Sequence, residues 1–110
     1  MSERAQEAMW GAVDLHCHSG PNPIPRLFDH VGAATDGQRL GMQGILAKSH
    51  HHNTVMDLLA MRSQLEPLTT KIYGGVALNS QVGGINPYVV EMSLRMGGRA
   101  VWLPTISSIR

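Results

Sequence analysis

The chain has 110 residues, with nine Lys plus Arg against eight Asp plus Glu and a formal net charge of +1. A net charge this close to zero does not indicate the strongly basic surface that binds nucleic acid or an acidic membrane. We therefore expect a small-molecule substrate and no nucleic-acid or membrane partner. No apolar run approaches the ~18 residues of a membrane span, and the N-terminal segment lacks the apolar core of a signal peptide. Cys17 is the single cysteine, which excludes an internal disulfide. We therefore predict a soluble, cytoplasmic protein.

Four short apolar runs are predicted to be β-strands, and they recur roughly every thirty residues. They cover residues 12–18, 44–50, 72–79 and 99–105. The stretches between them are long enough for a helix and a return loop, which is the rhythm of βαβ units with parallel strands. We therefore predict an α/β fold of about four βα units in one domain, residues 1–110. Within it, residues 1–11 are an N-terminal extension and residues 12–110 carry the βα units.

The third segment between predicted strands has the clearest helix signals. Asn86 is the expected N-cap and Pro87 the first helical residue, and Gly97 follows the expected end. The inward face of this helix is expected near Val90 and Leu94, because these positions are one helical turn apart.

The other two connecting segments differ in their helical character. The second is expected to begin its helix near Asn53 or Thr54 and to end before Pro67. The first, residues 29–44, has several glycines within one helical length, and each costs up to ~1 kcal/mol relative to Ala in a helix interior. These glycines are Gly32, Gly37 and Gly41. We expect this first helix to be the weakest or the most broken.

The strongest chemical signal is AVDLHCH, in which a predicted strand ends on two histidines. Side chains alternate across a strand, so His16 and His18 are expected on one face and Cys17 on the other. The Pro-rich and Gly-containing loop that follows, residues 19–27, is expected over the strand end, where parallel α/β enzymes keep their chemistry. Two neutral imidazoles there can bind one divalent metal ion. The alternative is a pair of satisfied polar histidines at a loop edge.

The second predicted strand ends in LAKSHHH, residues 46–52. Alternation places Lys48 and His50 on one face, so His50 is the preferred further metal ligand and His51 the second choice. His52 is expected to be solvated or to cap the next helix. Beside the metal, Lys48 would serve as a charged substrate anchor, a base with a lowered pKa or a carbamylated bridging ligand. The alternative is that three adjacent histidines merely open a surface helix.

The ends of the last two predicted strands carry weaker signals. Asn79 leads into a glycine-containing turn, which either binds an anion through backbone N–H groups or simply connects a strand to a helix. We favour the simple turn. Thr105 is the one polar candidate at the end of the fourth strand, and Trp102 is expected to serve packing.

The motifs VDLHCHSGP and GILAKSHHHNT resemble the amidohydrolase superfamily, whose first barrel strand ends in a metal-binding HxH. The set DLHCHSGP, AKSHH, GGVALNSQVGGINP and VWLPT is most similar to an uncharacterised branch of amidohydrolase-like proteins, over residues 13–105. The resemblance implies the N-terminal half of a (β/α)8 TIM-like barrel, which needs at least ~200 residues when complete. It also implies one or two divalent ions, Zn²⁺ or Mn²⁺, that activate water to hydrolyse a small amide, ester or related bond.

Carried over residue by residue, the resemblance assigns metal binding to His16 and His18, and it reaches His50 and the candidate catalytic Lys48 by strand position. A weaker resemblance connects the chain to phosphoesterases of the polymerase-and-histidinol-phosphatase type, in which His50 would match a ligand histidine. The amidohydrolase superfamily takes further histidines and a catalytic Asp from later strands, and this chain has no histidine after His52. We therefore expect an incomplete hydrolase site.

Three hypotheses about function follow from this incomplete site. The chain is a hydrolase that acts together with a missing C-terminal half, or it is a half-barrel whose open edges are closed by a second copy in a homo-oligomer. The third hypothesis is a non-catalytic remnant that binds a metal or a ligand.

Overall fold

Parallel strands form the centre of the protein, seen here in a computed structural model that describes residues 1–108. One sheet has the order β1 (Val13–Cys17), β2 (Gly44–Ala47), β3 (Lys71–Tyr73), and a second pairs β4 (Gly75–Ala77) with β5 (Ala100–Trp102). Every pairing between these strands is parallel. The predicted α/β class with parallel strands is therefore confirmed.

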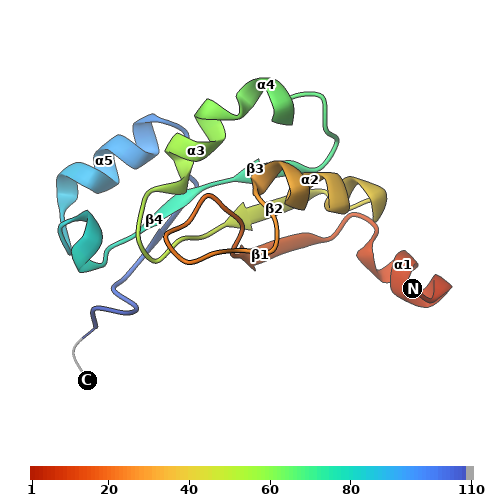
Figure 1. Cartoon of the computed structure of the whole chain (residues 1–110), viewed down its shortest axis with the longest axis horizontal. Helices are drawn as coiled ribbons and strands as arrows, with labels where there is room; N and C mark the ends of the chain where they lie inside the picture. The colour runs from red at the N-terminus through yellow and green to blue at the C-terminus, as the bar shows by residue number, and fades with distance from the viewer. Residues whose placement is uncertain (109–110) are drawn as a thin grey trace.

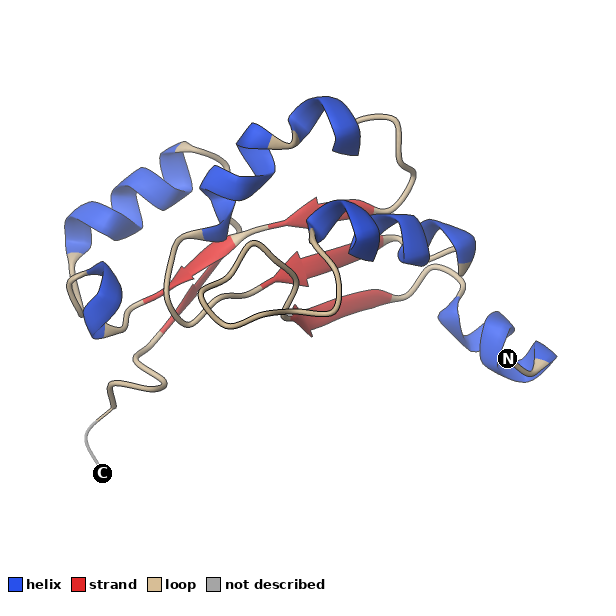
Figure 2. Cartoon of the chain, in the orientation of Figure 1, coloured by secondary structure: helices blue, strands red, loops and turns tan. Residues whose placement is uncertain are grey.

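Four helices lie on one side of the strands, and the opposite side carries none within residues 1–108 (Figures 1 and 2). They are α2 (His30–Arg39), α3 (Thr54–Ala60), α4 (Arg62–Leu65) and α5 (Pro87–Arg95). The N-terminal extension contains α1 (Glu3–Met9), which lies beyond the start of β1, and a short 3-10 helix, η1 (Ser80–Val82), follows β4. No helix in residues 1–108 is both long and apolar enough to cross a bilayer.

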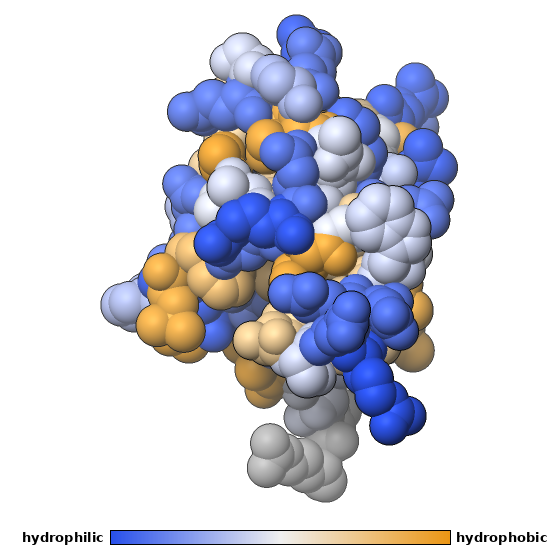
Figure 3. All heavy atoms as spheres, turned by 90° about the vertical axis from the view of Figure 1, so that its right-hand side faces the viewer, coloured by the Kyte–Doolittle hydropathy of each residue, from blue (hydrophilic) through white to orange (hydrophobic). Residues whose placement is uncertain are grey.

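The core lies between the sheet and these helices, and it is built from small and medium apolar side chains. Its members are Ala33, Ala34, Ile45, Ala47, Val55, Val76, Ala77 and Leu78. The uncovered side of the sheet is also apolar, with an open pocket of about 290 Å³ lined by Val13, Leu15, Leu46, Tyr73 and Arg99. Figure 3 shows the end of the molecule that carries α1, where polar side chains separate the exposed hydrophobic areas.

The third predicted strand is divided at Gly74 into β3 and β4. Its first half pairs with β2 and its second half with β5. The Thr54 hydroxyl oxygen lies at the division, 3.0 Å from the Ala47 carbonyl oxygen, and it accepts the N–H of Gly75 at 3.0 Å. A Cβ at Gly74 would lie 2.8 Å from this hydroxyl oxygen. Glycine at this position therefore leaves room for the Thr54 side chain, which forms hydrogen bonds where the strand pairing is interrupted.

The first helix, α2, is continuous over ten residues, so the prediction that it would be the weakest or most broken was wrong. The Asp29 carboxylate caps it by accepting the N–H of Gly32 at 2.7 Å. A Cβ at Gly37 would lie 2.8 Å from Cγ2 of Thr70, so this glycine allows the helix to pack closely against the segment before β3. Gly41, with φ +70°, lies beyond the helix end. Tertiary packing here outweighs helix propensity.

The predicted N-cap of α5 and the predicted start of α3 near Asn53 or Thr54 are confirmed. The Asn53 side chain accepts the N–H of Val55 at 3.1 Å, and Asn86 accepts the N–H of Tyr88 at 2.9 Å. The second helix breaks at Met61, where ψ is 9°, into α3 and α4.

The predicted inward face of α5 was wrong at Leu94, which is 54% exposed, because the buried residue of this helix is Ser93. A Cβ at Gly98 would lie 2.5 Å from Oγ of Ser93. The backbone at Gly98 therefore approaches Ser93 closely and buries it.

Candidate metal and ligand site at the carboxyl ends of the strands

The two histidines that end the first strand lie against each other. Nε2 of His16 is 2.9 Å from Nε2 of His18, and their ring centroids are 4.8 Å apart. Two imidazole nitrogens bound to one tetrahedral zinc ion, at about 2.0–2.1 Å each, lie about 3.3 Å apart. A movement of a few tenths of an ångström would therefore bring this pair to ligand spacing.

An irregularity of the first strand directs these side chains. The register of β1 against β2 shifts between Asp14 and Cys17, and the Asp14 carboxylate accepts the backbone N–H of His16 at 2.9 Å. Bulges of this kind reorient side chains and are common next to active sites.

The protonation of His18 follows from its contact with the second strand. Its Nδ1 lies 2.8 Å from the backbone carbonyl oxygen of Lys48, and because a carbonyl only accepts, Nδ1 carries the hydrogen. The neutral ring then has its lone pair on Nε2, the atom that faces His16. Metal-binding histidines are commonly held in this way, with the second ring nitrogen donating to a carbonyl group.

His50 extends the pair to a row of three rings. Its ring centroid is 5.1 Å from that of His18, and its Nδ1 is 2.7 Å from the hydroxyl oxygen of Thr105. Because Nδ1 contacts Thr105, Nε2 is the ring nitrogen left for a ligand. The structure thus brings together three of the four predicted metal ligands, His16, His18 and His50.

Asn79 holds the His50 segment in place. Its side chain is fully buried, and its Nδ2 donates to the His50 carbonyl at 2.9 Å and to the Thr105 hydroxyl at 2.8 Å. Its Oδ1 accepts the N–H groups of Thr105 and Ser107 at 2.8 and 3.1 Å. Because both donors and both lone pairs are used within the protein, Asn79 positions the loop rather than a ligand. This agrees with the simple connecting turn favoured from the sequence.

The fourth predicted ligand, His51, lies at the margin of this row. Its ring centroid is 6.5 Å from that of His50, and its buried Nδ1 has no hydrogen-bond partner within residues 1–108. In the same part of the chain, no three His, Cys, Asp or Glu side chains stand close enough together to hold a metal ion without adjustment. Metal binding by three of these side chains would therefore require the histidine rings to move.

Lys48 is buried beside the histidine row. The residue is 5% exposed, and its Nζ lies 5.1 Å from the ring centroid of Trp102, in cation–π contact. No Asp or Glu of the described chain forms an ion pair with it. Trp102, expected only to serve packing, thus also supports the ammonium group.

The surroundings favour neutral imidazoles in the row. Burial lowers the pKa of His18 and of His50 from the ordinary value of 6.5, and the nearby charge of Lys48 lowers both further. For His18 the charge of Arg26 acts in the same direction, whereas the hydrogen bond to Lys48 acts against it. Both rings are therefore neutral, and able to bind a metal, at neutral pH.

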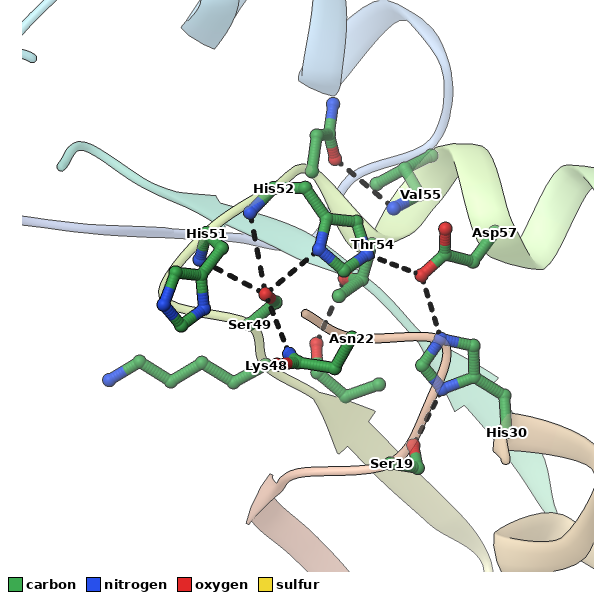
Figure 4. Close-up of polar contacts among 12 residues, drawn as sticks. Ser19, Asn22, His30, Lys48, Ser49, His51, His52, Thr54, Val55 and Asp57 are labelled. Atoms are coloured by element: carbon green, nitrogen blue, oxygen red, sulfur yellow. Dashed lines mark hydrogen bonds and ion pairs between the residues drawn. The ribbon is translucent and has the colours of Figure 1, made fainter. Parts of the chain in front are cut away.

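A second cluster, which the sequence did not reveal, joins the loops after β1 and β2 (Figure 4). Buried His30 lies 2.5 Å from the Ser19 hydroxyl through Nδ1, and 2.9 Å from the Asp57 carboxylate through Nε2. The same carboxylate oxygen lies 2.7 Å from Nε2 of His52, whose Nδ1 is 2.9 Å from the Ser49 hydroxyl. Two Ser–His arms therefore share one aspartate.

In this cluster, Ser19–His30–Asp57–His52–Ser49, each arm has the Ser–His–Asp contact order of a hydrolytic triad. The serine hydroxyls, however, are not accessible to a substrate. Both serines are buried, and the Ser49 oxygen also accepts N–H groups from Asn22, His51 and His52. A nucleophile must reach a substrate, so these hydroxyls serve to hold the loops together. The expectation that His52 is solvated or caps the helix was wrong, because Asp57 and Ser49 bind both of its ring nitrogens.

The ionisation of Asp57 matches this structural role. Burial raises the pKa of Asp57, but the hydrogen bonds from His30 and His52 outweigh burial, so the pKa lies below its ordinary value of 3.8. The only sequence signal of the cluster is that His30 and Asp57 belong to the first turns of two helices that follow neighbouring parallel strands.

The fold and site together define an α/β protein that places histidines and a buried lysine at the carboxyl ends of its parallel strands. The chain belongs to DUF6282, a family of unknown function, whose model matches residues 11–110. No curated protein and no solved structure matches it.

Proposed function

We propose that the chain carries the first part of a metal-dependent hydrolase of the amidohydrolase type that acts on a small molecule. The observation that carries the proposal is the His16–His18 pair, with Nε2 atoms 2.9 Å apart at the end of the first parallel strand. Parallel βα units with helices on one side support the further proposal that the fold is the N-terminal half of a TIM-like barrel.

The residues present fit a divalent ion of the kind that imidazole binds, such as Zn²⁺ or Mn²⁺. His16, His18 and His50 would hold it, with His51 as a further candidate for the same or a second ion. When bound, such an ion acts as a Lewis acid and lowers the pKa of coordinated water. The Lys48 carbonyl accepts the N–H of Nδ1 of His18, so Nε2 of the neutral ring has a free lone pair. The contact between Nδ1 of His50 and the Thr105 hydroxyl orients the His50 ring.

Lys48 is the residue of the chain that we propose acts on the substrate. Its Nζ is held beside the histidine row by Trp102 and has no carboxylate partner within residues 1–108. Of the three roles considered from the sequence, an anchor for a charged substrate group fits this arrangement directly.

Elemental analysis of the purified protein tests the metal site. We expect a stoichiometric amount of Zn²⁺ or Mn²⁺ in the wild type and none in a His16→Ala/His18→Ala double variant. A Glu91→Ala/Arg95→Ala variant, which removes an exposed ion pair on α5, is the matched control and should retain the metal. A metal-free wild type that also fails to bind added Zn²⁺ and Mn²⁺ would refute the proposal.

A substrate screen separates the hydrolase from the phosphoesterase of the polymerase-and-histidinol-phosphatase type. The metal-loaded wild type should hydrolyse amide or ester substrates, and the double variant should not. Turnover of phosphate esters alone would favour the phosphoesterase, and metal binding without any turnover would favour a non-catalytic remnant.

The uncovered side of the sheet favours a second role, association with another protein layer. Its open pocket is lined mostly by apolar side chains, among them Leu15, which is 70% exposed. We propose that a second copy, or the C-terminal half of a barrel, covers this face. Sedimentation velocity tests the homo-oligomer: the wild type should form a dimer and Leu15→Asp a monomer, whereas a monomeric wild type would leave the C-terminal half as the partner.

A further inference from the structure

The surroundings of the histidine row carry positive charges that no ion pair within residues 1–108 neutralises. Lys48 is 5% exposed and forms no ion pair within residues 1–108, and Arg26 belongs to the loop that follows β1. The nearest acid along the chain, Asp14, uses a carboxylate oxygen to accept the backbone N–H of His16. The described part of the site therefore has cationic groups and no ion pair that neutralises them.

A lysine that is only 5% exposed normally has a carboxylate or several hydrogen-bond acceptors beside its ammonium group, because removing the charge from water is costly. The Nζ of Lys48 has neither within residues 1–108, and its closest favourable contact is the Trp102 ring. Figure 4 shows the side chain extended away from the Ser49 hydrogen bonds and therefore free of that cluster. The three N–H donors of Lys48 thus remain for a group that residues 1–108 do not supply.

A second unsatisfied donor comes from the loop after β1. Nε of Arg26 is buried and has no hydrogen-bond partner within residues 1–108. Arg26 lies close to the end of β1, because its Cβ is 4.0 Å from the position that a Cβ of Gly20 would take, two residues after His18. A buried arginine nitrogen without a partner is unusual, since the great majority of buried polar atoms are paired.

We propose that Lys48, assisted by Arg26, binds a compact oxyanion, the carboxylate or phosphate group of a small molecule. An oxyanion supplies both the negative charge and the hydrogen-bond acceptors that these two residues lack. The identification of this anion as part of a substrate rests on the proposed hydrolase function, whereas the anion site itself does not require a metal. The inference deepens the proposed function by limiting the substrates to anionic molecules.

Calorimetric titration of the chelator-treated, metal-free protein tests the site, with inorganic phosphate and acetate as separate probes. The wild type should bind at least one probe saturably, and Lys48→Met should weaken that binding at least tenfold. Lys48→Arg, which keeps the charge, should retain most of it. Lys71→Met is the matched control, because Lys71 is exposed and its Nζ contacts the Glu66 and Leu68 carbonyls, so its loss should leave anion affinity unchanged.

Absence of saturable binding in the wild type, or equal affinity in Lys48→Met, would overturn the inference. If circular dichroism shows that Lys48→Met does not fold, changes in the NMR amide chemical shifts of the wild type on adding each probe locate the anion site instead. Phosphate or acetate should shift the signals of Lys48 and Ser49 most, and shifts confined to other segments contradict the site. The stronger probe identifies the phosphate or the carboxylate group.

Metal content, measured separately, distinguishes the two proposals. A protein that holds stoichiometric metal but no anion refutes only the anion site. A protein that binds the anion through Lys48 but never a metal refutes the hydrolase and leaves an anion-binding protein.

Discussion

Nδ1 of His18 donates a hydrogen bond to the Lys48 carbonyl at 2.8 Å, and this contact joins the ends of β1 and β2 at the candidate site. It allows the structural and metal-binding roles of His18 to be separated. Asparagine can present an amide N–H near the position of Nδ1 but has no atom in the position of Nε2. We expect His18→Asn and His18→Ala to lose metal equally, with His18→Asn more stable by about 0.5–1.5 kcal/mol.

Competition with a chromophoric zinc chelator and unfolding in urea measure the two effects. Retention of wild-type zinc affinity by His18→Asn would show that Nε2 is not a ligand.

The shared aspartate of the second cluster should be important for stability. Asp57→Asn removes the charge that binds His30 and His52, and it leaves buried His30 with an imperfect partner. We expect a loss of about 1–3 kcal/mol in the free energy of unfolding, measured with urea. The matched control is Asp36→Asn, whose pair with Arg39 is exposed and should change stability by less than about 0.5 kcal/mol. Equal losses in both variants would contradict a special role for the cluster.

The lowered pKa of Asp57 predicts how acid affects the protein. Because the folded-state pKa lies below 3.8, ionised Asp57 stabilises the fold above the unfolded-state pKa, and this contribution is lost as pH falls through the folded value. Stability curves of the wild type should therefore fall more steeply than those of Asp57→Asn below about pH 4. Parallel curves for the two proteins would argue against the ionised form.

Zinc binding should depend on pH through His18 and His50. Both have a pKa lowered from 6.5, so both stay neutral at pH 7 and protons begin to compete with the metal only below that ordinary value. We expect the zinc Kd to be nearly constant from about pH 7 to 8 and to rise below about pH 6.5. Titrations with a chelator at several pH values check this, and a Kd that already rises steeply between pH 8 and 7 is the contrary result.

The close packing of α2 makes Gly37 sensitive to substitution. Alanine favours helices, yet its Cβ would lie 2.8 Å from Cγ2 of Thr70 and 3.3 Å from Cδ1 of Ile45. We expect Gly37→Ala to destabilise the protein by about 1–3 kcal/mol. Thr35→Ala, at an exposed position of the same helix, is the control and should be neutral or slightly stabilising. A stabilised Gly37→Ala protein would mean that the helix tolerates a shift away from Thr70.

The sequence by itself determined the features that depend on neighbouring residues. The parallel βα order, the helix start near Asn53 and the N-cap Asn86 could be predicted because periodicity and capping act over a few positions. The adjacency of His16 and His18 was also expected from strand alternation, since they are two residues apart, although the strand register shifts between Asp14 and Cys17. Their possible role as ligands was therefore apparent before the fold was known.

Only the tertiary structure decided the features that depend on residues far apart in the chain. Asp57 lies 27 positions from His30, and no local pattern shows that two helix starts meet at one edge of the sheet. The continuity of α2 depends on the fit of Gly37 against Thr70, which outweighs propensity. The lack of an ion pair for Lys48 within residues 1–108 likewise depends on which side chains the packed strands bring within reach, because an ion pair is set by distance in space.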